Sequence, residues 1–189
     1  MEIYLVRHPQ ADIERGICYG QTDVALKPEN IDIALQKIKM VIPDITDFVI
    51  YSSDLIRCKT IAQRLGTEDR IFYSDKIREI NFGNWEMKHW DEIPKDELNA
   101  WMKDFVNQNS YNGESYNDLY MRTIQFWKEL INMEHSKIMV ITHGGVIRSI
   151  LCYILNISLS NSFKLSIDFS SISKVKINNK TERIEFINK

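Results

Sequence analysis

The sequence has 189 residues, with 24 lysines and arginines against 26 aspartates and glutamates and a formal net charge of −2 at pH 7. This length predicts one domain, residues 1–189, with room for a hydrophobic core. Hydrophobic residues make up 44% and charged residues 26%, which excludes a disordered or collagen-like chain. The near-neutral charge, with no run of Lys and Arg, argues against binding to nucleic acid or to an anionic membrane.

The N-terminal segment has no basic leader, and no apolar stretch approaches ~18 residues, so we expect a soluble, cytoplasmic protein. Cys18, Cys58 and Cys152 are odd in number and widely spaced. This spacing fits neither a disulfide framework nor a paired zinc motif. We expect free thiols, with Cys58 an inert thiol of the core.

Short apolar runs predict strands at residues 3–6, 48–51 and 138–141, each ending at polar residues. Apolar residues at helical spacing begin at Leu55 and Val146, so a helix follows the second and the third strand; Ser or Asp at 52–54 is expected to cap the first of these helices. Between these two strand–helix units, helices are expected over 101–106 and 116–130. Ser115 and Asp118 resemble a capping box for the second of these.

The C-terminal part alternates apolar and polar residues over 165–169, 175–177 and 184–186, with a turn at 178–180. This alternation predicts edge strands that are partly antiparallel. The succession of strands and helices predicts an α/β fold, a three-layer α/β/α sandwich with a mostly parallel central sheet and an antiparallel edge strand.

Arginines and histidines stand where the predicted strands stop: Arg7 and His8 after the first, Arg57 one turn into the helix after the second, and His143 after the third. Ligands of open α/β sheets bind outside the carboxyl ends of the strands, so these four side chains are expected to converge. Two arginines and two helix N-termini favour a compact dianion such as phosphate. The histidines indicate chemistry, because a neutral imidazole can attack phosphorus. A metal site is disfavoured, since the arginines would repel a cation.

Four segments carry a family resemblance in this order: LVRHPQ (5–10), SSDLIRCKT (52–60), REINFGNWE (78–86) and THGGVIR (142–148). Together they resemble the histidine phosphatase superfamily, in its phosphoglycerate mutase-like branch, over nearly the whole chain. The resemblance implies a phosphoglycerate mutase-like fold and no metal or cofactor. It also implies that His8 becomes phosphorylated, that Arg7, Arg57 and His143 hold the phosphoryl group, and that Glu79 is the general acid and later the base.

Within this superfamily the chain is most similar to the alpha-ribazole phosphatases of cobalamin nucleotide-loop assembly, which share segments like REINFGNWE and CYGQTD (18–23). This similarity implies hydrolysis of a small phosphorylated metabolite, alpha-ribazole 5′-phosphate. Tyr19, Trp85 and Trp90 are expected to offer aromatic surface to its flat base. Substrate-binding residues are expected to be Tyr19, Gly20, Gln21, Gly144 and Ser115, with a plain helix cap as the alternative role of Ser115.

The chain departs from the family pattern at Pro9, where the family has Gly, at Gln10-Ala11, and in lacking the family's phosphate-contacting Asn before Asp23. These departures leave open a non-catalytic phosphate-binding regulatory module. A phosphoglycerate mutase or a sugar-phosphate phosphatase of the same superfamily is the enzymatic alternative. The short chain favours a phosphatase over a mutase, and the sequence does not predict the oligomeric state.

The remaining conspicuous side chains are given structural roles. Arg148 is expected to form a salt bridge, and Trp101 and Trp127 lie on apolar helical stripes typical of the core. His89 is expected at the rim of the site. His135 is expected to be a cation at a helix C-terminus.

Overall fold

The computed structural model describes residues 1–179 and 181–189; Lys180, in the predicted turn, lies outside the described residues. The strands and helices in chain order are β1 (Glu2–Arg7), α1 (Pro28–Val41), β2 (Val49–Ser53), α2 (Ile56–Leu65), β3 (Ile71–Ser74), α3 (Lys95–Lys103), α4 (Tyr116–Leu130), β4 (Lys137–Thr142), α5 (Gly144–Leu155), β5 (Ile172–Asn178) and β6 (Thr181–Phe186). Short 3₁₀ turns, including Asp75–Ile77 and Leu159–Lys164, connect several of them.

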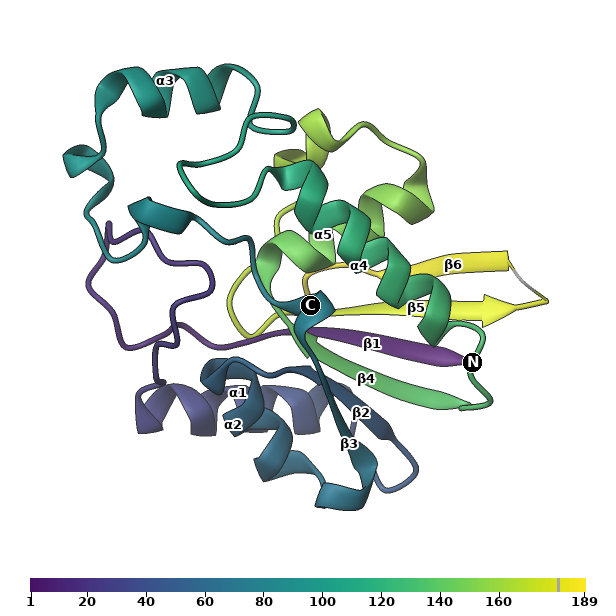
Figure 1. The fold of residues 1–189 in the computed structure, drawn as a ribbon. Coiled ribbons are helices and arrows are strands. Elements are labelled where there is room, and N and C mark those ends of the chain that lie inside the picture. The colour runs from purple at the N-terminus through teal and green to yellow at the C-terminus, as the bar shows by residue number, and fades with distance from the viewer. Residues whose placement is uncertain (180) are drawn as a thin grey trace.

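The strands form one sheet in the order β3-β2-β4-β1-β5-β6. The first four of these are mutually parallel, whereas β5 runs antiparallel to β1 and β6 antiparallel to β5. Figure 1 shows α1 and α2 on one face of this sheet and α4 and α5 on the other. The predicted α/β sandwich, with a mostly parallel sheet and antiparallel strands at one edge, is confirmed.

The core lies on both faces of the sheet because successive strand residues point to opposite sides. In β1, Ile3 and Leu5 pack in the cluster under α4 and α5, whereas Tyr4 and Val6 pack in the cluster under α1 and α2. Residues buried on both faces explain why the parallel strands read as continuous apolar runs. A third, smaller cluster around Trp85 holds the segment that carries α3.

The structure corrects several details of the predicted elements. The helix predicted at 101–106 begins earlier, at Lys95, and ends at Lys103. Residues 165–169 follow a 3₁₀ turn and form a loop, not a strand. The helix α2 has no side-chain cap from residues 52–54; instead the Asp23 carboxylate accepts from the Ile56 N–H at 2.6 Å. His135 lies beyond the end of α4 and so is not at its C-terminus.

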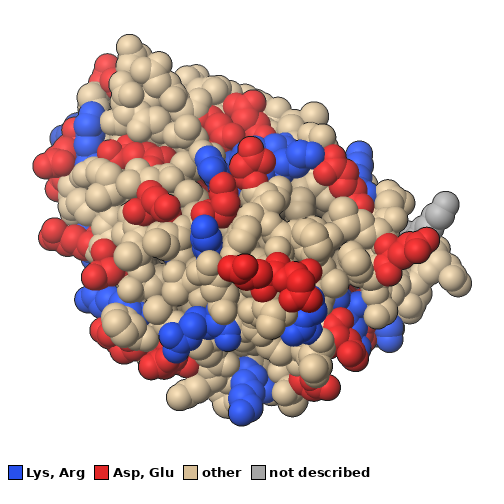
Figure 2. Space-filling model, turned by 60° about the horizontal axis from the view of Figure 1, so that its bottom comes forward, with Lys and Arg blue, Asp and Glu red and all other residues tan. Residues whose placement is uncertain are grey.

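Charged side chains of both signs are interspersed on the face displayed in Figure 2, as the small net charge suggests. Mixed charges of this kind are typical of a solvated surface. Within the described residues, no helix is long and apolar enough to cross a membrane.

Candidate active site

The carboxyl ends of two adjacent parallel strands bring the histidines together. Arg7 pairs with Thr142 in the register of β1 and β4, so the next residues, His8 and His143, emerge side by side. Their ring centroids are 5.0 Å apart, and the two residues are only 3% and 0% exposed. The expected convergence of these two side chains is thus present.

The orientation of the His8 ring follows from its contact with the next residue. His8 Nδ1 lies 2.6 Å from the Pro9 carbonyl oxygen. A carbonyl can only accept, so Nδ1 carries the hydrogen and Nε2 keeps its lone pair. Proline removes a backbone N–H but not this carbonyl, so Pro9 fulfils the orienting role.

Both imidazoles are held in their neutral form. Burial, followed by the charge of Arg57, lowers the pKa of His8 and of His143 well below the usual range of histidine. An unprotonated imidazole at neutral pH is a competent nucleophile. Cys58 Sγ lies 3.5 Å from His143 Nε2, and burial raises the pKa of this thiol, which favours the predicted inert role.

Two arginines line the same end of the sheet. Arg57, fully buried in the first turn of α2, donates to the carbonyls of Thr22, at 3.0 Å, and Gly20. Arg7 donates to the Ile167 carbonyl at 2.6 Å. The Nε atoms of both arginines are buried and have no hydrogen-bond partner among the described residues. Unpaired buried donors are costly, and guanidinium N–H groups match phosphoryl oxygens, so the site suits an anion.

Glu79 lies on an irregular segment that faces the start of α5. Its Oε2 accepts from the Gly145 N–H at 3.1 Å, and its Oε1 accepts from the Ile80 N–H at 3.0 Å. A Cβ on Gly145 would lie 2.3 Å from Glu79 Oε1, so only glycine allows this approach without a shift. The α5 N-terminus therefore carries both His143 at its cap and a backbone donor to Glu79.

A cavity of about 140 Å³ opens beside Glu79. Its lining is largely aromatic and consists of Tyr19, Glu79, Ile80, Phe82, Trp101, Phe105, Tyr116, Gly145, Arg148 and Phe163. Trp101 packs against the third cluster, as expected of a core residue, and also lines the cavity. The predicted salt bridge of Arg148 is wrong, since Arg148 forms no ion pair within the described chain and donates instead to the Leu165 carbonyl at 3.0 Å.

The expected aromatic surface is only partly at this cavity. Tyr19 lines it, with the Arg57 guanidinium 5.4 Å from the centre of its ring. Trp85 is 2% exposed and donates to Glu97 at 2.9 Å, while Trp90 packs against it in the third cluster. These two tryptophans support the wall rather than line it.

The other predicted substrate residues have varied positions. The Gly20 carbonyl holds Arg57, and Gln21 donates from Nε2 to the Glu79 carbonyl at 3.1 Å. Gly144, at the start of α5, would place a Cβ 3.3 Å from Arg7 Cζ. Ser115 is buried, its Oγ accepts from the Asp118 N–H at 3.2 Å, and the Asp118 carboxylate accepts from the Ser115 N–H at 2.9 Å. This is a complete capping box, so the structure gives Ser115 the cap role.

Several residues of the site were not predicted. The Glu86 carboxylate accepts from the backbone N–H groups of Gln21, Thr22 and Phe82, and Arg122 binds the segment that carries Glu79. Arg122 sits in an ordinary helix and has no distinctive sequence signal, whereas Glu86 ends the REINFGNWE segment, which was the signal that could have found it. His89, expected at the rim, pairs with Asp91 at 2.6 Å and does not line the cavity.

Comparisons with known proteins find relatives over most of the chain. A 28% identical protein of Hydrogenobacter thermophilus, provisionally named phosphoserine phosphatase 2, aligns with 99% of this chain and 95% of its own length. The "Probable phosphoglycerate mutase GpmB" of Shigella boydii is also 28% identical, over 93% of this chain and 84% of its own.

The crystal structure of the alpha-ribazole phosphatase from Shigella flexneri has the same fold, with a TM-score of 0.90 at 22% identity and coverage of 100% of this chain and 96% of the other. The family model described as histidine phosphatase superfamily (branch 1) matches residues 3–189. With nearly the whole chain matched and the fold shared, this protein belongs to the histidine phosphatase superfamily, branch 1.

Proposed function

We propose that this protein is a phosphomonoesterase that works through a phosphohistidine on His8. The observation that carries the proposal is the arrangement of two buried, neutral imidazoles beside two buried arginines with unpartnered Nε donors. Such a site combines a nucleophile with fixed positive charge for the transferring phosphoryl group. Arg7, Arg57 and His143 are proposed to hold its oxygens.

The reaction is proposed to proceed in two displacements. His8 Nε2 attacks phosphorus, the bond from phosphorus to the ester oxygen breaks, and a protonated Glu79 gives its proton to the departing alkoxide. Water then attacks the phosphohistidine while the Glu79 carboxylate takes a proton from it, and the P–N bond breaks to release inorganic phosphate and free His8. Glu79 adjoins the cavity, which therefore suits the alcohol half of the substrate.

Trapping of the phosphoenzyme tests this mechanism. Rapid quenching with ³²P-labelled substrate should reveal an acid-labile phosphoenzyme, which His8→Ala should abolish together with phosphate release. His89→Ala, which removes a histidine outside the cavity, is the matched control and should behave as the parent protein. Phosphate binding without any phosphoenzyme would instead identify a non-catalytic phosphate-binding module. Turnover by the His8→Ala variant would exclude His8 as the nucleophile.

For the substrate, we propose alpha-ribazole 5′-phosphate. The aromatic lining from Tyr19, Phe82, Trp101 and Phe163 offers stacking surface for a flat base next to Glu79. The REINFGNWE and CYGQTD segments support the same choice by resemblance. A second candidate is a phosphorylated hydroxy or amino acid such as phosphoserine or phosphoglycerate, favoured by Arg148, which brings one cation to the cavity for a carboxylate.

A substrate panel separates the two. Rates of phosphate release from alpha-ribazole 5′-phosphate, phosphoserine and 3-phosphoglycerate should be compared with chelator present. A 100-fold preference in kcat/KM for the ribazole ester, worth about 2.7 kcal/mol, would support the first candidate. The same preference for a carboxylated substrate would favour the second, and transfer between hydroxyls of phosphoglycerate at a comparable rate would indicate a mutase.

A further inference from the structure

The segment that carries Glu79 has no regular secondary structure to hold it. It lies between the 3₁₀ turns Asp75–Ile77 and Gly83–Trp85, outside the sheet and the helices. Its backbone carbonyls therefore need partners from elsewhere in the chain. Thr142 Oγ1 donates to the Ile77 carbonyl at 2.7 Å, and Gln21 Nε2 donates to the Glu79 carbonyl at 3.1 Å. One further side chain donates to the carbonyls of residues 76, 78 and 79.

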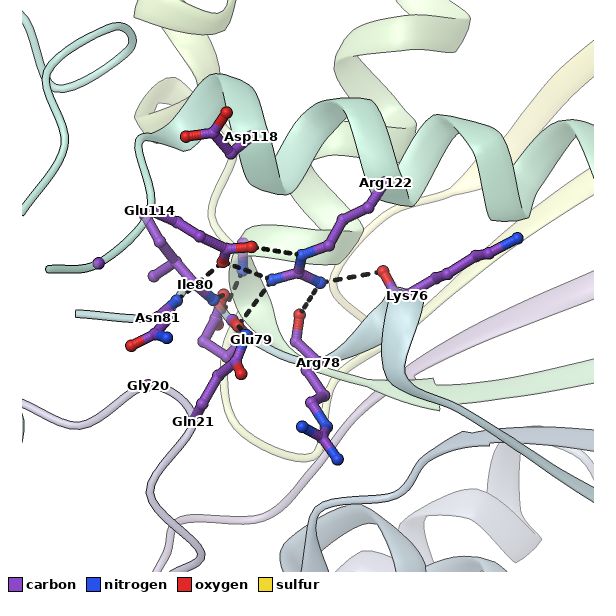
Figure 3. A network of polar contacts seen from close by, with 12 residues as sticks. Gly20, Gln21, Lys76, Arg78, Glu79, Ile80, Asn81, Glu114, Asp118 and Arg122 are labelled. Carbon is purple, nitrogen blue, oxygen red and sulfur yellow. Dashed lines mark hydrogen bonds and ion pairs between the residues drawn. The ribbon is translucent and has the colours of Figure 1, made fainter. Parts of the chain in front are cut away.

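That side chain is Arg122, on the second turn of α4. Its Nη1 donates to the carbonyls of Lys76 at 3.0 Å and Arg78 at 2.6 Å, and its Nη2 donates to the Glu79 carbonyl at 2.8 Å. Its remaining donors bind Glu114 in bidentate fashion, at 2.9 Å from Nε and 2.8 Å from Nη2 (Figure 3). A guanidinium has five N–H donors, so every one of them is used.

Glu114 extends the contact to the other side of Glu79. Its Oε2 also accepts from the Asn81 N–H at 2.9 Å. The side chains of Arg122 and Glu114 are 18% and 22% exposed, so water competes little for these bonds. Figure 3 shows this pair between α4 and the Glu79 segment, where it binds backbone groups on both sides of Glu79.

We propose that Arg122, oriented by Glu114, is a positioning residue for Glu79 as the general acid. It does not line the cavity, so it acts through the Glu79 backbone. The Glu79 carboxylate accepts from the Gly145 N–H, while the Arg122 guanidinium binds the backbone carbonyl of Glu79. The residue is thus held at both its side chain and its backbone. Catalytic groups displaced by about 1 Å can lose ~100-fold in rate. The proposal rests on the function proposed above.

Leaving-group dependence is the test, since a proton donor matters only when the leaving group needs a proton. An alkoxide must be protonated as it departs, whereas p-nitrophenolate leaves without help. We therefore compare kcat/KM, which covers the steps up to departure of the alcohol, for phosphoserine and for p-nitrophenyl phosphate. Arg122→Lys keeps the positive charge but replaces the five-donor fork with three donors on a flexible stem.

For Arg122→Lys we expect kcat/KM for the alkyl ester to fall at least about tenfold, with the aryl ester changed less than about threefold. Glu114→Gln should show the same selectivity more weakly and serves if the first variant does not fold. Lys76→Gln is the matched control: it removes the Lys76–Glu129 ion pair, at 2.8 Å, between the same segment and α4 without touching a backbone carbonyl. This control should leave kcat/KM for both esters unchanged.

Glu79→Gln and His8→Ala separate the proposals. The mechanism stands if Glu79→Gln lowers kcat/KM for the alkyl ester only. If Arg122→Lys and Glu114→Gln then change kcat/KM for both esters equally, the positioning role is overturned while the mechanism remains intact. If Glu79→Gln lowers kcat/KM for both esters equally, Glu79 is not the general acid, and this inference is refuted with it. Turnover in His8→Ala would refute the phosphohistidine mechanism itself.

Discussion

Gly145 offers the sharpest test of how the acid is placed. A methyl group at this position would lie 2.3 Å from Glu79 Oε1 and 2.8 Å from Leu119 Cδ2. Ordinary contact between heavy atoms requires about 3.5 Å, so the carboxylate must retreat by roughly 1 Å. This shift would also stretch the 3.1 Å bond from the Gly145 N–H to Glu79 Oε2. Gly145→Ala therefore moves the carboxyl while leaving its chemistry intact.

The expected loss follows from the displacement. A misplacement of about 1 Å costs ~100-fold in rate, which corresponds to about 2.7 kcal/mol of transition-state free energy. We expect kcat/KM for an alkyl phosphate to fall by this factor. Gly145 is the second residue of α5, and alanine favours helices over glycine, so the helix itself should not be weakened.

Steady-state phosphate release, beside thermal unfolding of the same samples, measures both effects. Gly66→Ala is the control, because its added Cβ would lie 2.8 Å from Ile50 Cδ1, away from the cavity. This control should lower the Tm without lowering kcat/KM. A folded Gly145→Ala variant with parental kcat/KM on the alkyl ester would refute the assigned contact between Glu79 and α5.

Three further predictions follow from the same geometry. Because the pKa values of His8 and His143 are lowered by burial and then by Arg57, below about pH 6.5 the unfolded chain binds protons that the folded one does not. The free energy of unfolding should thus fall as pH drops from 7 to 5, by up to about 1.4 kcal/mol per pH unit for each histidine. Urea titrations at several pH values should show a smaller slope of this free energy against pH in His143→Gln than in the parent protein. Equal slopes would contradict the prediction. Trp101→Ala should reduce kcat/KM for alpha-ribazole 5′-phosphate about tenfold more than for phosphoserine, and equal losses would argue against base stacking at the cavity. Ser115→Ala should cost about 1 kcal/mol in urea denaturation and leave KM unchanged, whereas a raised KM would return Ser115 to the substrate site.

The two histidines of the candidate site could be found from the sequence because they lie at the ends of strongly apolar strands. Runs such as residues 3–6 and 138–141 are unambiguous, and the residue that follows a parallel strand lies at the same edge of the sheet as its neighbours. His8 and His143 therefore meet through local patterning and one rule of topology. By contrast, α1 and the short β3 were not predicted, since mixed amphipathic segments give weaker signals than buried strands.

The placement of Glu79 and the shape of the cavity depended on tertiary structure. Glu79 was singled out by resemblance alone, because acids are numerous and its segment has no periodic pattern. Its position depends on Arg122 and Gly145, which are 43 and 66 residues away along the chain. The cavity likewise brings Tyr19, Trp101 and Phe163 together from three separate loops and helices. Local sequence thus determined where the two histidines and two arginines gather, while contacts between distant segments decided where Glu79 and the aromatic cavity lie, because only folding brings such residues within bonding distance.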